Sequence, residues 1–184
     1  MRVLGIDPGS HKTGWGAIEV EGSRVSHVDN GVIFLDDDGD LTVRLVDLAH
    51  RLRDRLVELK PDVVVVEDVF VRKGARSALI LGQARGVVLA TCGMQGRPVR
   101  SVPTSQVKLR VAGRGRADKV QVAEMVRALL GLPELPFEDA ADALAVALSA
   151  VGDVMRPAPP RARPTRKSRG RDALLALARA QGKA

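Results

Sequence analysis

Hydrophobic and polar positions recur along this chain with two periods, one typical of strands and one typical of helices. Short apolar runs bounded by Gly, Pro or acidic residues predict strands at residues 2–7, 13–20, 24–34, 62–67 and 98–102. Apolar positions spaced three and four apart predict helices at residues 41–60, 74–93, 105–112, 119–130 and 138–155. Strands that alternate with long helices predict an α/β fold.

Two of these segments have apolar patterns that predict burial, either within the protein or at a subunit interface. Val63 to Val66 is apolar at every position, which is typical of a central parallel strand covered by helices on both faces. The helix at 74–93 is apolar around much of its circumference, yet it contains Gly82 and Gly86, and a glycine inside a helix costs about 1 kcal/mol relative to alanine. Close approach of another backbone would explain both glycines, so we expect either a subunit interface or a central helix of the monomer.

The composition supports one folded domain followed by a basic arm. The 184 residues are 45% hydrophobic but include three Phe, one Trp and no Tyr, so we expect an aliphatic core. We expect the domain to span residues 1–156 and the Pro- and Arg-rich residues 157–184 to be disordered. The single cysteine excludes an intramolecular disulfide framework. No apolar run approaches the ~20 residues of a membrane span and no signal pattern precedes the first strand, so we expect a cytoplasmic protein without a membrane partner.

The net charge of +7 is distributed unevenly. Residues 157–184 carry eight basic groups and one acid, so residues 1–156 are neutral overall. Within that neutral part, residues 72–127 carry 12 basic and 2 acidic groups, which indicates a polyanion-binding face. The alternative is a solvated basic surface balanced by acids elsewhere. The acidic run at residues 36–40 is expected to be a solvated loop whose carboxylates cap the following helix.

Four acidic residues occupy positions where a site of an α/β protein would form. Asp7 and Glu67 each end an apolar strand, and open α/β sheets place their chemistry at the carboxyl ends of strands. Asp139 and Asp142 are three residues apart and share one face of a helix. Asp139 alone is consistent with capping of that helix. Asp142 is followed almost entirely by Ala, Leu and Val, where a carboxylate is costly unless it is paired or bound to a metal.

Convergence of these carboxylates predicts a site for two divalent cations. Without compensation, four such charges would repel one another until some held protons. Oxygen ligands without a nearby Cys or His favour Mg²⁺ or Mn²⁺ over zinc. Two such ions about 3.5–4 Å apart activate a water and stabilise the leaving oxygen in phosphodiester hydrolysis.

Several segments of the sequence resemble the RuvC family of bacterial Holliday-junction resolvases. They are GIDPGSHKTGWG, VVVVEDVF, SALILGQARGV and FEDAADALAVALSA, in the family's order and at similar spacing. The resemblance covers nearly all of residues 1–155. It implies an RNase H-like fold with a mixed central sheet flanked by helices, a homodimer, and Mg²⁺-dependent nicking of two strands of like polarity at a four-way DNA junction. It also implies a branch-migration motor as partner, and the chain itself contains no nucleotide-binding P-loop.

The resemblance assigns roles to individual residues. Its acidic quartet maps onto Asp7, Glu67, Asp139 and Asp142. Lysines near the scissile phosphate correspond to Lys108 and Lys119, which could otherwise be ordinary surface lysines. The dimer-forming region contains Gly82 and Gly86.

The remaining matches concern DNA contacts. Phe70 corresponds to an aromatic residue that stacks on a base near the junction, although by itself it could be a core residue at a strand end. Its basic neighbours favour DNA, because an aromatic ring among cations suits an unstacked base. The other residues expected to contact DNA, beside Lys108 and Lys119, are Arg72, Lys73, Arg76, Arg114 and Arg116. No residue of 157–184 matches a family role.

Two other functions fit parts of the sequence. A kinase of the actin-like class also opens with a strand, an Asp-x-Gly step and Thr-Gly, but about 155 structured residues leave no room for its second domain, and the quartet has no role there. A non-catalytic DNA-binding protein would keep the basic middle but would not need all four acids. We therefore predict a structure-selective endonuclease that resolves four-way DNA junctions in recombination and repair.

Overall fold

The computed structural model describes residues 1–35, 40–68 and 74–154, which form one mixed sheet with helices on both faces. The elements are β1 (Arg2–Asp7), β2 (Lys12–Glu21), β3 (Arg24–Phe34), α1 (Leu41–Leu59), β4 (Val63–Asp68), α2 (Ala75–Met94), β5 (Val99–Pro103), α3 (Thr104–Ala112), α4 (Lys119–Leu130), α5 (Glu138–Ser149) and α6 (Val151–Val154). The strand order is β3-β2-β1-β4-β5. β2 is antiparallel to β1 and β3, whereas β1, β4 and β5 are parallel. The predicted α/β fold with a mixed central sheet is confirmed.

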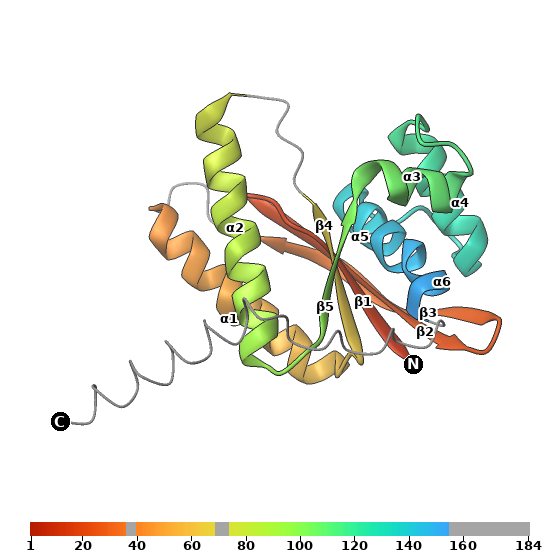
Figure 1. Ribbon diagram of the computed structural model, residues 1–184, viewed down its shortest axis with the longest axis horizontal. Coiled ribbons are helices and arrows are strands. Elements are labelled where there is room, and N and C mark those ends of the chain that lie inside the picture. Colours follow the sequence, from red (N-terminus) through yellow and green to blue (C-terminus); the bar gives the residue numbers. More distant parts are fainter. Residues whose placement is uncertain (36–39, 69–73, 155–184) are drawn as a thin grey trace, which may run out of the picture.

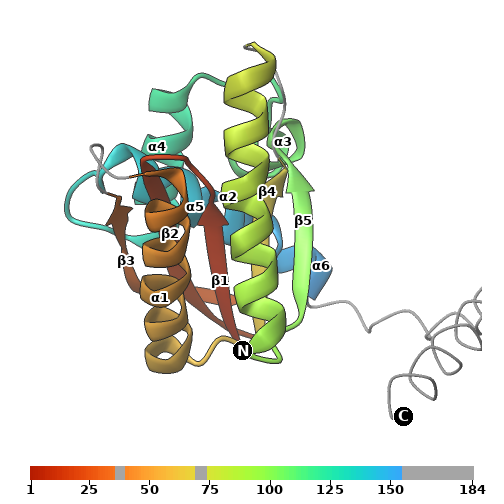
Figure 2. The same ribbon diagram turned by 90° about the vertical axis from the view of Figure 1, so that its left-hand side faces the viewer.

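The sheet separates two hydrophobic cores, and Figure 1 shows the helices that lie on its two sides. α1 and α2 cover one face and pack with Leu4 and Val64, and in Figure 2 both helices lie in front of the sheet. α3, α4 and α5 cover the other face and pack with Val3 and Val65. Successive residues of a strand point to opposite faces, so the central strands supply both cores. This explains why Val63 to Val66 is apolar without alternation.

Glycines in β1 and β2 let α5 lie directly against the sheet. A Cβ atom at Gly5 would overlap the backbone of Ala143, and one at Gly14 would overlap the backbone carbonyl of Asp139. Any side chain at these positions would push α5 away. The close packing brings the first turns of α5 to the edge of the sheet at which β1 ends.

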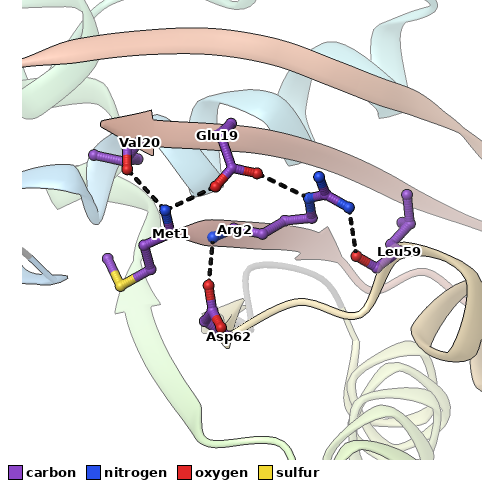
Figure 3. Close-up of polar contacts among 6 residues, drawn as sticks. All are labelled: Met1, Arg2, Glu19, Val20, Leu59 and Asp62. Carbon is purple, nitrogen blue, oxygen red and sulfur yellow. Dashed lines mark hydrogen bonds and ion pairs between the residues drawn. The ribbon is translucent and has the colours of Figure 1, made fainter. Parts of the chain in front are cut away.

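Charged contacts tie down the opposite end of β1, as Figure 3 shows. The amino group of Met1 donates to Oε1 of Glu19 at 2.7 Å, and Nε of Arg2 lies 3.0 Å from Oε2 of the same residue. Arg2 also donates from its backbone to Asp62 at 2.7 Å and from Nη1 to the carbonyl of Leu59 at 2.9 Å. These contacts join the start of β1 to the end of β2 and to the turn between α1 and β4. They fix the position of β1 and therefore of Asp7 at its other end.

Two local expectations from the sequence are wrong. Asp40 occupies the N-cap position of α1, but its side chain makes no capping hydrogen bond; residues 36–39 lie outside the described residues. The helix expected at 138–155 ends at Ser149, and the separate short helix α6 follows. The hydroxyl of Ser149 donates to the carbonyl of Val146 at 2.7 Å, a local bond of the kind that competes with a continuous helical ladder.

α2 is an apolar helix that the described chain leaves largely uncovered. Its buried residues are Ala84, Val88, Thr91 and Cys92. Leu79 is 65% exposed, and a Cβ atom at Gly82 or Gly86 would meet no described atom within 4 Å. Among the described residues, α2 is therefore not covered as a central helix of the monomer would be, which favours the interface explanation of its two glycines.

By length and composition, α2 is also the one helix among the described residues that could cross a membrane. Its most apolar window has a mean hydropathy of 1.3, and 22% of that window is buried. The expectation that no apolar segment reaches this length is thus wrong.

Candidate active site

The carboxyl ends of β1 and β4 meet the start of α5 at one edge of the sheet. β1 and β4 are parallel with Ile6 opposite Val66, so the next residues, Asp7 and Glu67, lie side by side. A cleft of about 260 Å³ opens at this edge. Its lining residues are Asp7, Glu67, Thr104, Val107, Lys108, Lys119, Val122, Asp142 and Ala145. The structure thus brings Asp142 on α5 to the same cleft as the two strand-end acids.

Asp7 is held in an environment that disfavours its charge. Burial, the neighbouring carboxylate of Glu67 with which it shares a hydrogen bond, and the charge of Asp142 raise the pKa of Asp7 to about 8. Lys119 acts in the opposite direction. Asp7 therefore keeps its proton at neutral pH in the metal-free protein, and a nearby cation would favour its loss.

Lys119 forms the electrostatic link between α4 and α5. Its ammonium group donates to Oε1 of Glu138 at 2.7 Å and to Oδ2 of Asp142 at 3.1 Å. These bonds raise the pKa of Lys119 above its ordinary value, and the bond to Glu138 has the larger effect. Burial raises the pKa of Asp142, while Lys119 opposes that rise. Lys119 therefore stays charged in the cleft and partly neutralises Asp142.

Arg85 on α2 braces the end of β4, where Glu67 lies. Its Nη2 atom lies 2.6 Å from Oδ1 of Asp68 and 2.7 Å from Oγ of Ser101 on β5. Its Nε atom donates to the backbone carbonyl of Glu67 at 3.3 Å. Neither Arg85 nor Glu138 was predicted from the sequence as a site residue. A charged residue inside an apolar helix was the available signal for Arg85.

The other predicted residues have different positions. Asp139 lies half-buried in the first turn of α5, and it is not among the residues that line the cleft. Arg76 is exposed at the start of α2, and Arg114 and Arg116 are exposed between α3 and α4. The segment 69–73, with the predicted contacts Phe70, Arg72 and Lys73, lies outside the described residues.

The donor atoms at this edge fit a hard divalent cation by their chemistry. Carboxylate oxygens are the ligands that Mg²⁺ and Mn²⁺ prefer, and the raised pKa of Asp7 reflects a concentration of negative charge that a cation would relieve. In the part of the chain that the structure describes, however, no three His, Cys, Asp or Glu side chains are gathered closely enough to hold a metal ion. Ligation by this set therefore requires side-chain movement.

Comparison with known proteins gives a consistent answer over nearly the whole described chain. The family profile described as "Crossover junction endodeoxyribonuclease RuvC" matches residues 3–150. The crossover junction endodeoxyribonuclease RuvC of Citrifermentans bemidjiense is 51% identical over 148 residues, which cover 80% of this chain and 90% of that protein. The protein of that description from Sorangium cellulosum is 45% identical over 179 residues, covering 92% of this chain and all of that protein.

A solved structure extends the likeness to three dimensions. Thermus thermophilus RuvC in complex with a Holliday junction substrate matches with a TM-score of 0.79 at 35% identity, over 84% of this chain and 94% of that one. Profile, sequence and structure agree over the segment that holds the acidic cleft. The chain belongs to the RuvC family of crossover junction endodeoxyribonucleases.

Proposed function

We propose that this protein resolves four-way DNA junctions by nicking two strands of like polarity, in homologous recombination and DNA repair. The observation that carries the proposal is the cleft in which Asp7, Glu67 and Asp142 lie together with Lys108 and Lys119. Carboxylates beside lysines suit a phosphodiester substrate, because the acids hold cations and the lysines meet the phosphate. The T. thermophilus relative was solved with a Holliday junction, and its family is one of nucleases that depend on divalent metal ions.

Asp7, Glu67, Asp139 and Asp142 would hold two Mg²⁺ ions per subunit, with Mn²⁺ as a substitute. When bound, such ions supply the Lewis acid that activates water and stabilises the leaving oxygen. Before ligation, Asp7 gives up the proton that its raised pKa retains. Asp139 lies one helical turn from Asp142 and would join the set through rotation of its side chain.

Lys119 and Lys108 would act on the phosphate. Lys119 is charged and donates a hydrogen bond to Asp142. If it donated to a phosphate oxygen instead, its ammonium group would lie where negative charge develops during cleavage. Lys108 lines the same cleft and would hold the DNA backbone. This backbone contact would be extended by Arg76, Arg114 and Arg116, which are exposed, and by Arg72 and Lys73. Phe70 would stack on an unstacked base near the junction.

We further propose a homodimer formed through α2. Its exposed apolar side chains and the uncovered Gly82 and Gly86 support close approach of a second copy. Two subunits would present two clefts to one junction, which accounts for paired nicks. A branch-migration motor is the expected partner, and a chromosomal substrate places the enzyme in the cytoplasm.

A non-catalytic DNA-binding protein is a weaker proposal. Such a protein would use the basic surface but would gain nothing from a half-buried cluster of acids that raises the pKa of Asp7. Burial of carboxylates costs stability, so the cluster requires a function of its own. Ligation of catalytic cations provides that function.

The proposal can be tested with a synthetic four-way junction and a linear duplex of matched sequence. The protein should nick the junction at paired positions with Mg²⁺ present, and should leave the duplex intact. Asp7→Asn should bind the junction in EDTA or Ca²⁺ without cleaving it when Mg²⁺ is present. Asp54→Asn, an equivalent change on the exposed face of α1, should cleave like wild type. Full cleavage by Asp7→Asn would contradict the proposed site.

A further inference from the structure

The protein exposes aromatic side chains beside its nuclease cleft. The sequence contains three Phe and no Tyr. Phe34 ends β3 and is 56% exposed, and Phe137 immediately precedes α5 and is 79% exposed. The third, Phe70, follows β4 and lies outside the described residues. Single exposed apolar residues are common on protein surfaces, but here both described Phe residues lie at the ends of elements, Phe34 at the end of β3 and Phe137 just before α5.

The topology places Phe34 at the same edge of the sheet as Asp7. β1 and β3 are both antiparallel to β2, so they run in the same direction and their carboxyl ends share one edge. Ile33 belongs to the core under α1. Because neighbouring strand residues point to opposite faces, Phe34 points to the face that α5 covers.

Lys12 connects Phe34 to the start of α5. Lys12 pairs with Phe34 in the register of β2 and β3, and its Nζ atom lies 5.6 Å from the centre of the Phe34 ring. A Cβ atom at Gly14, two residues after Lys12 in β2, would overlap the backbone carbonyl of Asp139, so the start of β2 lies against the first turn of α5, which Phe137 precedes. We call the surface formed by Lys12, Phe34 and Phe137 the aromatic shelf.

The shelf lies at the right distance from the cleft to contact the same DNA. β1 and β3 are separated by two strand spacings, or roughly 10 Å. The major groove of a duplex is about 12 Å wide. If one DNA strand lies at Asp7, the DNA strand on the other side of the groove therefore lies above the ends of β2 and β3. Exposed rings pack on sugars and on the faces of accessible bases, and a lysine pairs with phosphate.

We propose that the aromatic shelf is a second DNA-binding surface, which holds the strand that lies across the groove from the one being cut. This inference rests on the proposed junction-cleaving function. The two rings supply the apolar contact, and Lys12 supplies a contact to phosphate. The shelf thus contributes affinity for the DNA arm without taking part in the chemistry at the phosphate.

The test measures junction binding in EDTA as a function of salt, by fluorescence anisotropy. Phe34→Ala and Phe137→Ala combined should weaken binding on the order of 10-fold, with the slope of log K against log salt unchanged. Lys12→Gln should make that slope shallower by about one. Val57→Ala is the matched control, since Val57 is also 56% exposed but lies near the far end of α1. It should bind like wild type.

The two proposals can fail separately. If wild type cleaves the junction and the double Phe variant binds it like wild type, the shelf is overturned and the nuclease proposal stands; the surface then serves another partner, such as a protein. Single-turnover cleavage at saturating protein should be unchanged in the double variant. If the Ala variants melt early, Phe34→Gln and Phe137→Gln replace them, and normal binding by these would equally overturn the shelf.

Discussion

Lys119 donates a 3.1 Å hydrogen bond to Asp142, so a lysine proposed to meet the phosphate is paired with a carboxylate proposed to bind metal. Its second bond, 2.7 Å long, goes to Glu138. Lys119 is thus shared between one acid that lines the cleft and one that lies on its exposed rim. Under the proposed function, entry of a cation next to Asp142 and release of Lys119 toward DNA would be coupled.

Replacing Lys119 with Met should change two properties in opposite directions. Cleavage should slow on the order of 100-fold, because the charge that develops on the phosphate loses its ammonium partner. Binding of Mn²⁺ in the absence of DNA should tighten, because Asp142 is no longer neutralised. Single-turnover cleavage and calorimetric titration measure the two effects. A loss of both activity and metal binding would instead indicate damage to the cleft.

Replacing Glu138 with Gln should raise the Mg²⁺ concentration needed for half-maximal cleavage. Without Glu138, Lys119 pairs with Asp142 alone and competes more strongly with the cation. Glu134→Gln is the matched control, since it makes an equal charge change at an exposed position four residues earlier, before α5 begins. Equal shifts in the two variants would show a general charge effect and would contradict this explanation.

Arg85→Gln should lower cleavage activity, because Arg85 holds the end of β4 on which Glu67 lies. The substitution removes the hydrogen bonds to Asp68 and Ser101, and because both partners are at least partly exposed, each bond contributes only about 0.5–1.5 kcal/mol. We expect a higher Mg²⁺ requirement together with a modest loss of thermal stability. Arg85→Lys should restore part of the activity, and Arg100→Gln on exposed β5 should have no effect. Wild-type metal dependence of Arg85→Gln would show that the brace is not needed.

Metal-free stability should depend on pH through Asp7. Its pKa is raised from 3.8 to about 8, mainly by burial, so between these values the folded protein holds a proton that the unfolded chain has released. The free energy of unfolding from this source therefore falls as the pH rises through that window. In EDTA, wild type should lose melting temperature relative to Asp7→Asn as the pH rises, and saturating Mg²⁺ should reduce the difference. Parallel melting curves for the two proteins would contradict the assignment.

The site was predictable where its signals are local. Asp7 and Glu67 could be located because each ends a buried apolar run, and parallel strands present such ends at one edge. The i, i+3 spacing on an apolar helix singled out Asp142. The bond between Lys119 and Glu138 joins residues 19 positions apart on two helices, and no local period encodes such a contact.

The sequence pattern also does not specify how the helices pack. The apolar pattern of α2 predicted a helix correctly, but it could not distinguish a monomer core from an interface, because both produce apolar residues on every side. The packing, in which Gly86 meets no described neighbour, favours an interface. Likewise, the capping role expected of Asp40 depends on side-chain geometry that the sequence does not specify.

Gly86→Leu should shift the protein toward monomer. The monomer itself can accept the larger residue, because a Cβ atom at Gly86 meets no described atom within 4 Å, so a loss of dimer would come from a clash with the second copy. Sedimentation velocity measures the change, and paired nicking should fall with it. Gly152→Leu, at another position with open space around it, controls for the added apolar surface. A variant that stays dimeric would place the interface elsewhere.

Deleting residues 157–184 should weaken junction binding and flatten its dependence on salt. These residues contain eight basic groups and one acid, and each phosphate neutralised contributes about −0.9 to the slope of log K against log salt. Because the cleft and the shelf lie in residues 1–156, single-turnover cleavage at saturating protein should be unchanged. A tail of scrambled sequence should restore the slope, since phosphate contacts depend on charge rather than order. An unchanged slope in the truncated protein would mean that the arm does not contact DNA.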